Sequence, residues 1–412
     1  MISFNTSSNN DPNIIIFGGG SAQGDITSAL IRLGARVTRI VSIGDDGGSS
    51  GSLRDAFGVV PVGDIRNALV SMAQAFNSPK KLISFLDGRF HEDITEEALW
   101  DELNDMISMD HPLMNGIHPD SQKSLSRFLT YFKKELDKFD WSKKRFKLAN
   151  MSIGNLVLIG AYFGNSNNLN SAIDALKKLC NIRGSIWPTS LDGNIYLGAF
   201  LEDGSIILGE HNITKRDRIM DKRRIKKIFL TNKKDANKTG HNSVRAVANR
   251  EVINAINKAN IIIYGPGSFF TSILPHLLVD GIAESISGRN VPKILIGNIC
   301  QDNETHEHKL VKLVNIFLNT AQDDYISQTK AKRFITHIMA HKPIRGFDPC
   351  PKKGEYLPLG DVTSLSKEFI STRIKDYENP EKKGYHDPVI TAEEVIRIWK
   401  EEKVAIDRQL DN

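Results

Sequence analysis

Residues 13–41 read "NIIIFGGGSAQGDITSALIRLGARVTRIV", and this stretch decides the fold. It starts with an apolar run that ends in glycines, continues with apolar residues at helical spacing, and closes with a second apolar run. A strand, a glycine turn, a helix and a strand within roughly thirty residues form a βαβ unit, whose two strands pair in parallel. The stretch therefore predicts an α/β protein with a Rossmann-like, doubly wound and mostly parallel sheet.

The rest of the chain repeats and interrupts this pattern. A later strand-like run, "NIIIYG", is again followed by a glycine turn, and "GNIYLGAFLEDGSIILGEHNI" alternates around a central "DG" that predicts an antiparallel hairpin. A polar, helical region without glycine-rich turns separates both from the first unit, which predicts a helical insertion. The expected division is a disordered N-terminus at 1–12, a first core segment at 13–79, the insertion at 80–149, a second core segment at 150–305 with the hairpin at 186–213, and a C-terminal extension of helix and loop at 306–412.

The composition is that of an ordinary soluble globular protein. The 412 residues carry a formal net charge of +5, which is too weak to indicate nucleic acid but would help bind an anionic small molecule. The basic stretch 215–227 is interleaved with acids and lacks stacking aromatics, so a solvated surface is predicted there. The apolar runs are too short to span a bilayer and the N-terminus has no signal-peptide pattern, so a cytoplasmic protein without a membrane partner is expected. These totals are compatible with a homodimer.

The cysteines and histidines give no metal or redox signature. Cys180, Cys300 and Cys350 are scattered without a CxxC pair, which argues against a disulfide framework and a zinc site. Each is therefore predicted to be a small buried hydrophobic side chain rather than a nucleophile. His306 and His308 could reach a metal, but their spacing is not a zinc signature, so a loop near the site is predicted.

An acidic, glycine-rich loop follows the second predicted strand. Residues 44–51 read "GDDGGSSG", and ligands of open α/β sheets bind at the carboxyl ends of the strands. Asp45 and Asp46 offer hard oxygen ligands suited to Mg²⁺, while the Gly/Ser run offers N–H and hydroxyl donors for phosphate oxygens. The alternative is a hydrated loop, because Asp and Gly are the commonest turn residues.

Two other glycine-rich turns lie between a predicted strand and a predicted helix. "FGGGSAQG" at 17–24 has the context in which backbone N–H groups and the helix dipole hold phosphate, although its spacing differs from the nicotinamide fingerprint GxGxxG. "YGPGSFFTS" at 264–272 has the same context, and Ser268 or Thr271 could cap the next helix while its N–H groups face a diphosphate. Three such turns favour phosphate binding over three structural turns.

A further helix begins at "VPVGDIRN", residues 60–67. Asp64 is the predicted N-cap of this helix, because a short acidic side chain can accept the first free N–H groups. Arg66 could clamp phosphate with two hydrogen bonds, or it could form a surface ion pair.

Together these stretches resemble one family. "GGGSAQ", "DDGGSSGSLR", "GVVPVGDIRN", "GNLVLIGAY", "LEDGSIILGE", "GPGSFFTS" and "GNICQDNET" occur in the order and spacing of the CofD/YvcK-like family. The resemblance covers roughly residues 13–75 and 150–305. The combination is highly specific, whereas any one of its glycine turns is not.

The resemblance implies one of two functions. One kind of member is 2-phospho-L-lactate transferase, which passes a phospholactyl group from a guanosine diphosphate carrier to a deazaflavin with Mg²⁺. The other is the YvcK-type gluconeogenesis factor, which looks like a binder of UDP-sugars with a role in carbon metabolism and the cell envelope. The chain has "GPGS" where the transferases carry "PSNP", and "VGDIRN" where they carry "PDLDT", so it is similar to the YvcK type. A UDP-sugar-binding regulator is therefore expected; an Mg²⁺-dependent transferase and an interaction scaffold are the alternatives.

The resemblance also implies site residues. The acids that lie by the metal in the transferases are matched here by Asp45, Asp46 and Asp64, the candidate catalytic and Mg²⁺-binding residues. The nucleotide diphosphate would be bound by Gly18, Gly19, Gly20, Ser21, Gly47, Gly48, Ser49, Ser50, Arg54, Arg66, Asn67, Gly154, Asn155, Gly265, Pro266, Gly267, Ser268 and Thr271. There are three departures from the family pattern: Ala22 replaces a glycine, Ser52 stands where arginine is common, and Val62 replaces a proline.

Overall fold

The structure is a computed structural model that covers most of the chain. It describes residues 11–410 apart from 140, 142–145, 217–220, 222, 233–242, 323–332, 343–349, 351–354 and 367–369. The disorder predicted for 1–12 falls almost entirely outside the described residues, as does part of the basic stretch 215–227.

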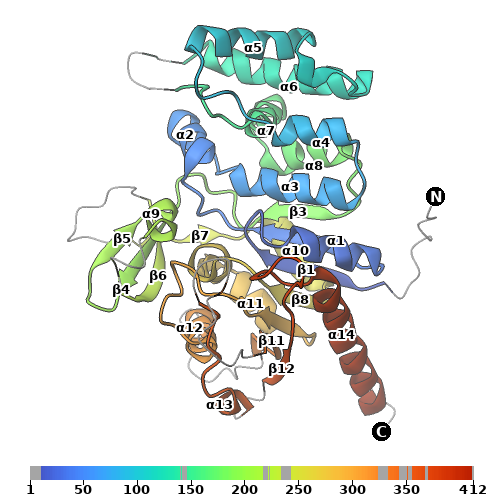
Figure 1. The fold of residues 1–412 in the computed structure, drawn as a ribbon, viewed down its shortest axis with the longest axis vertical. Coiled ribbons are helices and arrows are strands. Elements are labelled where there is room, and N and C mark those ends of the chain that lie inside the picture. Colours follow the sequence, from blue (N-terminus) through green and yellow to red (C-terminus); the bar gives the residue numbers. More distant parts are fainter. Residues whose placement is uncertain are drawn as a thin grey trace.

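The core is a seven-stranded parallel sheet (Figure 1). The strand order is β12-β11-β10-β8-β1-β2-β3, and every neighbouring pair is parallel. The strands are β1 (Asn13–Gly18), β2 (Arg36–Val41), β3 (Ser185–Pro188), β8 (Ile261–Tyr264), β10 (Lys293–Ile296), β11 (His337–His341) and β12 (Ser371–Lys375). Since the chain adds strands first on one side of β1 and later on the other, the predicted doubly wound α/β fold is confirmed.

Helices cover both faces of this sheet. On one face, Ile16 of β1 lies in an apolar cluster with residues of α1 (Gly24–Arg32) and α14 (Pro388–Leu410). The next residue, Phe17, belongs to the larger cluster on the other face. Strands buried on both faces have continuous apolar runs, which explains the sequence of β1. The other helices that flank the sheet are α3 (Gly63–Ala75), α10 (Arg250–Lys258), α11 (Ile282–Ser287) and α12 (Leu310–Gln322).

A layer of helices lies beyond α3, at the top of Figure 1. It contains α4 (Lys80–Asp87), α5 (Glu96–Ser108), η1 (Pro112–Met114), α6 (Pro119–Leu136), α7 (Ile153–Gly164) and α8 (Leu169–Leu179). The backbones of α6 and α7 approach closely at Gly160, where a side chain would collide with the Phe128 carbonyl. The predicted insertion supplies α4 to α6. None of the helices in the described part of the chain has both the length and the apolar character needed to cross a bilayer.

A small antiparallel sheet stands beside the parallel one. Its order is β5-β4-β6, with β4 (Tyr196–Leu201), β5 (Ile206–Leu208) and β6 (Ile225–Thr231). The predicted hairpin is therefore confirmed, with Gly204 at φ 84° in its turn. The start of the predicted range, however, belongs to β3, because residues 185–188 pair in parallel with β2. The remaining short strands are β7 (Ala246–Val247) and β9 (Val279–Asp280), and the remaining helix outside the site is α13 (Thr363–Ser366).

Two predictions, for the helix after β8 and for two of the cysteines, are wrong. The helix predicted after the glycine turn at 264–267 is replaced by a π-helical turn, η2 (Phe269–Ile273), and a 3₁₀ turn, η3 (Leu274–Leu278). Pro275 lies at the junction, where it has no N–H to continue an α-helix.

The second error concerns two of the cysteines. Cys300 and Cys350 are joined in a disulfide, with Cα atoms 6.1 Å apart. Their separation of 50 residues hid this pairing from sequence reasoning, which depends on local spacing. Cys180 is buried, as predicted, and burial raises the pKa of its thiol to about 12.

Candidate functional site

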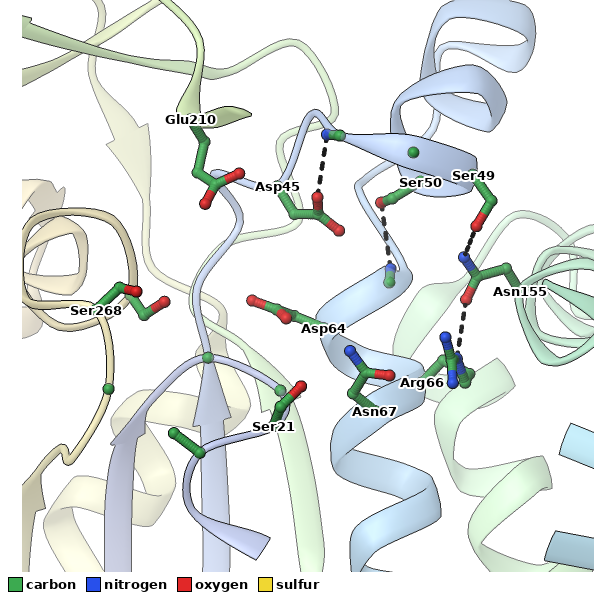
Figure 2. Close-up of a pocket in the computed structure, with 18 of the residues that line it drawn as sticks. Ser21, Asp45, Ser49, Ser50, Asp64, Arg66, Asn67, Asn155, Glu210 and Ser268 are labelled. Carbon is green, nitrogen blue, oxygen red and sulfur yellow. Dashed lines mark hydrogen bonds between the residues drawn. The ribbon is translucent and has the colours of Figure 1, made fainter. Parts of the chain in front are cut away.

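A cavity of about 370 Å³ opens where β1, β2 and β8 end. It lies between the three glycine-rich loops that follow these strands (Figure 2). Its lining residues are Gly19, Gly20, Ser21, Ala22, Asp45, Gly47, Gly48, Ser49, Ser50, Gly63, Asp64, Arg66, Asn67, Arg89, Asn155, Glu210, Gly267, Ser268 and Ser272. Ligands of open α/β sheets bind at this edge, so the cavity is the candidate site.

A buried arginine, Arg39, fixes the first loop by hydrogen bonds to its backbone. The Arg39 guanidinium donates to the carbonyl oxygens of Gly19 at 2.6 Å and Gly20 at 3.1 Å. Burial lowers the pKa of Arg39 to about 10, so the side chain stays charged at neutral pH. A side chain at Gly20 would bring a Cβ within 2.6 Å of the Asp64 carbonyl oxygen. The loop therefore presents bare backbone to the cavity because glycine alone fits there.

The acidic loop leads directly into a helix that the sequence did not predict. Helix α2 (Gly48–Phe57) begins inside the "GGSSG" run, with Gly47 as its N-cap. The first N–H groups of a helix lack intrahelical acceptors and attract anions. Ser49 and Ser50 lie in this first turn, so the small residues supply a helix N-terminus rather than a loose loop.

Asp64 reaches the cavity instead of capping its helix. The N-cap position of α3 is Val62, so the N-cap prediction for Asp64 is wrong. The Asp64 carboxylate accepts a hydrogen bond from the Gly20 N–H, which ties α3 to the first loop. Burial and then the neighbouring Asp45 carboxylate raise the pKa of Asp64 to about 6.

Two other carboxyl groups point toward Asp64 (Figure 2). Asp45 accepts the Gly47 N–H at 3.2 Å, and burial raises the pKa of Asp45 above its usual value. Glu210, the first residue of α9 (Glu210–Thr214), also lines the cavity and lies beside Asp45 in Figure 2. Burial raises the pKa of Glu210 to about 7, and the Asp45 and Asp64 carboxylates add to the shift. Asp45 thus raises the pKa of Asp64, and both raise the pKa of Glu210, so this part of the cavity suits a shared proton or a cation held by one or two of these carboxylates.

A chain of hydrogen bonds joins three residues that line the cavity, Arg66, Asn155 and Ser49. The Arg66 Nε donates to the Asn155 Oδ1 at 3.4 Å, and the Asn155 Nδ2 donates to the Ser49 Oγ at 2.9 Å. Arg66 also pairs with Asp87 at 2.7 Å, so the ion-pair alternative is present; Arg66 lines the cavity as well, and the phosphate clamp stays a prediction. Arg89 is a second basic residue that lines the cavity.

Seven predicted residues do not line this cavity. Asp46 turns away, and its Oδ1 accepts the His211 N–H in the first turn of α9 at 2.8 Å. Arg54 donates to the Gly193 and Ile195 carbonyl oxygens and stacks on the Tyr196 ring. Outside the lining are Gly18, Asp46, Arg54, Gly154, Gly265, Pro266 and Thr271, of which Pro266 lines a neighbouring cavity.

Thr271 belongs to a buried cluster around Glu304. The Glu304 carboxyl group accepts the Phe270 and Thr271 N–H groups at 3.1 Å and the Thr271 hydroxyl at 2.6 Å. The Thr214 hydroxyl lies 3.3 Å from Glu304 and 2.8 Å from Glu210. Burial raises the pKa of Glu304 to about 8, with Asp302 adding to the shift. These N–H groups, expected to face a diphosphate, are therefore already taken by Glu304.

The lining residues absent from the predicted set are Ala22, Gly63, Arg89, Glu210 and Ser272. Glu210 ends the stretch "LEDGSIILGE" and Ser272 ends "GPGSFFTS", and both stretches carry the family resemblance, which was the available signal. Arg89 follows α4 without any local pattern. Among the residues that the structure describes, no group of three or more His, Cys, Asp or Glu side chains could hold a metal ion. His306 and His308 therefore belong to no such group.

Comparisons with known proteins agree on one family. The family model described as 2-phospho-L-lactate transferase CofD matches residues 14–345. The chain is 30% identical over 291 residues to the gluconeogenesis factor of Halalkalibacterium halodurans, which covers 71% of this chain and 68% of that protein. It is 28% identical over 397 residues to the putative gluconeogenesis factor of Streptococcus pyogenes serotype M3, covering 94% of this chain and 98% of that protein. The crystal structure of a UPF0052 family member from Bacillus halodurans is similar, with a TM-score of 0.66, 25% identity, and coverage of 94% of this chain and 100% of that one.

Proposed function

The chain belongs to the CofD family, and from this premise we propose that its cavity binds a nucleotide diphosphate of the UDP-sugar type together with Mg²⁺. The observation that carries the proposal is the cavity itself. It combines exposed glycine backbone, the N-terminus of α2 and two arginines with three inward carboxyl groups. Backbone N–H groups and arginines suit phosphate oxygens, and carboxylates suit a hard cation that bridges to them.

The donor set of the cavity fits Mg²⁺ in a particular way. Magnesium is usually held by one or two carboxylates, while phosphate oxygens and water complete its octahedron. Asp45 and Asp64 are the residues that would hold it, since each lies on the cavity wall and the Asp45 carboxylate is close enough to raise the pKa of Asp64. When bound, the ion would neutralise charge on the diphosphate. Glu210 would then complete the acidic wall and orient water or a ligand hydroxyl.

A regulator that binds without turnover is the function we favour. The relatives named as gluconeogenesis factors support it, and so do "GPGS" and "VGDIRN" in place of the transferase motifs. We propose that the protein acts in the cytoplasm on carbon metabolism or cell-envelope synthesis.

The second candidate is an Mg²⁺-dependent transferase that acts on a guanosine diphosphate donor. One observation favours it besides the family description. The pKa values of Asp64, about 6, and of Glu210, about 7, lie near neutrality. A general base works best when its pKa is close to the operating pH, so either carboxylate could take a proton from an acceptor hydroxyl.

Calorimetric titration distinguishes these functions. UDP-N-acetylglucosamine and GDP would be titrated with and without Mg²⁺ into wild type, Asp45→Asn and the control Asp55→Asn, an exposed acid on the same helix α2. We expect Mg²⁺-dependent binding of the UDP-sugar without turnover, lost in Asp45→Asn and retained in the control. Binding of GDP together with phospholactyl transfer would favour the transferase. Binding of neither nucleotide by the wild type would refute the proposal.

A further inference from the structure

We propose that the disulfide between Cys300 and Cys350 is a site of reversible exchange with a small dithiol, and that its redox state sets how tightly the candidate site binds its ligand. This inference rests on the proposed function, because it presumes that the site binds a nucleotide diphosphate. It adds a regulatory input to that site. In the cytoplasm, the location proposed for this protein, disulfides are usually transient or redox-sensing rather than permanent.

The loop that carries Cys300 holds the glycine-rich loop after β8. This loop connects β10 to α12. In it, the Asn298 Nδ2 donates to the Gly267 carbonyl oxygen at 2.8 Å, and the Gly267 N–H donates to the Asn298 Oδ1 at 3.2 Å. Farther along the same loop, Glu304 accepts two N–H groups of η2. Cys300 lies between these two anchoring residues, so a displacement of Cys300 would move the supports of Gly267, which lines the site.

The packing around the disulfide is sparse. Ile299, Cys300 and Cys350 form a buried apolar cluster of their own, with Tyr356 packed against it, apart from the two larger clusters of the core. Two backbone hydrogen bonds of 2.9 Å also join this loop to residues 355–357. A cluster this small buries little apolar area and opens at a lower free energy than the main core. After reduction, the loop can therefore shift while the sheet stays folded.

A reductant can reach the disulfide through a neighbouring cavity. This cavity has a volume of about 200 Å³ and is lined by Cys300 together with Gly267 and Ser268, which also line the candidate site. Its size admits a small dithiol but not a folded protein. Cys350 is only 2% exposed, so the attack falls on the Cys300 sulfur.

The exchange balances in electrons and protons. A thiolate of the dithiol attacks the Cys300 Sγ, the bond to the Cys350 Sγ breaks, and Cys350 leaves as a thiolate that takes up a proton. The second thiolate of the dithiol then attacks the dithiol sulfur bound to Cys300, which leaves and is protonated in turn. The dithiol departs as a cyclic disulfide, oxidised by the two electrons that the protein has gained. The Cys300 Sγ lies 3.8 Å from the Gly384 carbonyl oxygen, which can accept the new S–H.

The coupling between the disulfide and the site works in both directions. A ligand that binds the oxidised form more tightly stabilises the disulfide by the same factor. The ratio of reduced to oxidised dithiol at which half of the protein is reduced should therefore rise by that factor when the nucleotide is saturating. A disulfide without influence on the site would show no such shift.

The test compares two redox states of the same chain, so it does not depend on the folding of a variant. Oxidised wild type and wild type reduced with dithiothreitol would be titrated calorimetrically with UDP-N-acetylglucosamine and with GDP, in the presence of Mg²⁺. The double variant Cys300→Ser, Cys350→Ser mimics the reduced state and cannot respond to the dithiol. Cys180→Ala is the matched control, because it removes the third cysteine, which is free, and keeps the disulfide.

We expect the reduced protein to bind the nucleotide roughly 5- to 150-fold more weakly than the oxidised protein, the usual range for coupled sites. Reoxidation should restore tight binding, and the Cys180→Ala control should respond like the wild type. The inference is overturned if both redox states bind equally, if the double variant binds as tightly as oxidised wild type, or if the nucleotide leaves the half-reduction ratio unchanged. A wild type that binds neither nucleotide in either state overturns the proposed function as well.

Discussion

Replacing Glu304 tests the buried cluster that the sequence did not reveal. The Glu304 carboxyl group is fully buried and accepts two backbone N–H groups, from Phe270 and Thr271, at 3.1 Å. Glu304→Ala would leave both N–H groups without an acceptor in a place that water does not reach. Each such group costs roughly 1–3 kcal/mol, so the free energy of unfolding should fall by roughly 2–6 kcal/mol.

Glu304→Gln should cost far less. Burial raises the pKa of Glu304 to about 8, so the native side chain carries a proton at pH 7 and glutamine has nearly its shape and hydrogen-bonding capacity. The amide oxygen can still accept both N–H groups, and its NH₂ can donate to the Thr271 or Thr214 hydroxyl. We expect a loss below about 1 kcal/mol at pH 7.

The pH dependence of stability provides a second test that the buried Glu304 is protonated at neutral pH. The folded-state pKa of Glu304, about 8, lies above the ordinary value of 4.5, so the folded protein binds more protons between these two values. The stability that Glu304 contributes is therefore complete below pH 4.5 and is lost as the pH rises through about 8. Glu304→Gln cannot titrate and removes this component.

Scanning calorimetry at pH 6 and pH 8.5 would compare wild type with Glu304→Ala, Glu304→Gln and the control Glu202→Ala. Glu202 is an exposed acid paired with Arg224 at 2.7 Å, and such pairs contribute less than about 1 kcal/mol. For a chain of this length roughly 1 kcal/mol corresponds to 1 °C, so Glu304→Ala should melt roughly 2–6 °C lower. A Gln variant as unstable as the Ala variant at pH 6 would show that Glu304 is ionised and refute the reasoning.

Three other predictions follow from the site and the fold. Cys350→Ser should lower the melting temperature of the oxidised protein, because the disulfide between Cys300 and Cys350 closes a loop of 50 residues and such a closure is worth up to about 4 kcal/mol. Wild-type protein treated with reductant should melt at the same temperature as the variant, and an unchanged melting temperature in the variant would contradict the prediction. Gly20→Ala should weaken nucleotide binding at least about tenfold, because the new Cβ would lie 2.6 Å from the Asp64 carbonyl oxygen. Gly288→Ala is the control in the same calorimetric titration and should bind normally, because the nearest atom to its new Cβ, the Glu284 carbonyl oxygen, would be 3.7 Å away. Mg²⁺-dependent binding should strengthen as the pH rises from 5.5 to 7.5, because the cation competes with the proton on Asp64, whose pKa is about 6. An affinity that is flat across this range would exclude Asp64 from the cation site.

The fold could be predicted because its evidence is local. The apolar run of β1, the glycines after it and the spacing of α1 lie within one stretch of sequence, and pairing in parallel follows from that order. The hairpin of β4 and β5 was visible for the same reason, since its turn residues stand between its strands. Helix α2 was missed because glycine and serine have low helix propensity, and only tertiary contacts favour the helix there. One such contact is the Ser50 hydroxyl, which accepts the N–H groups of Val62 and Gly63 at 3.2 Å.

The parts of the site that escaped prediction are made by long-range contacts. Glu210 reaches the cavity from α9, which follows the small antiparallel sheet, and residues 384–386 line the neighbouring cavity from the far end of the chain. Cys300 meets Cys350 across 50 residues. No local spacing rule brings these residues together, since their positions depend on how the elements pack. What the sequence could supply was the set of loops that meet at one edge of the sheet.

The adjacent acids of the second loop show where sequence reasoning stops. As neighbours in sequence, Asp45 and Asp46 look equivalent and were both assigned to the metal. In the structure the first carboxylate faces the cavity, while the second accepts the His211 N–H and so holds the helix that begins with Glu210. Removing either acid should therefore disturb the same acidic wall, one directly and the other through the position of α9. Loss of binding alone could not separate them. Of the two, only Asp45 should alter the Mg²⁺ requirement at saturating ligand, because only the Asp45 carboxylate lines the cavity.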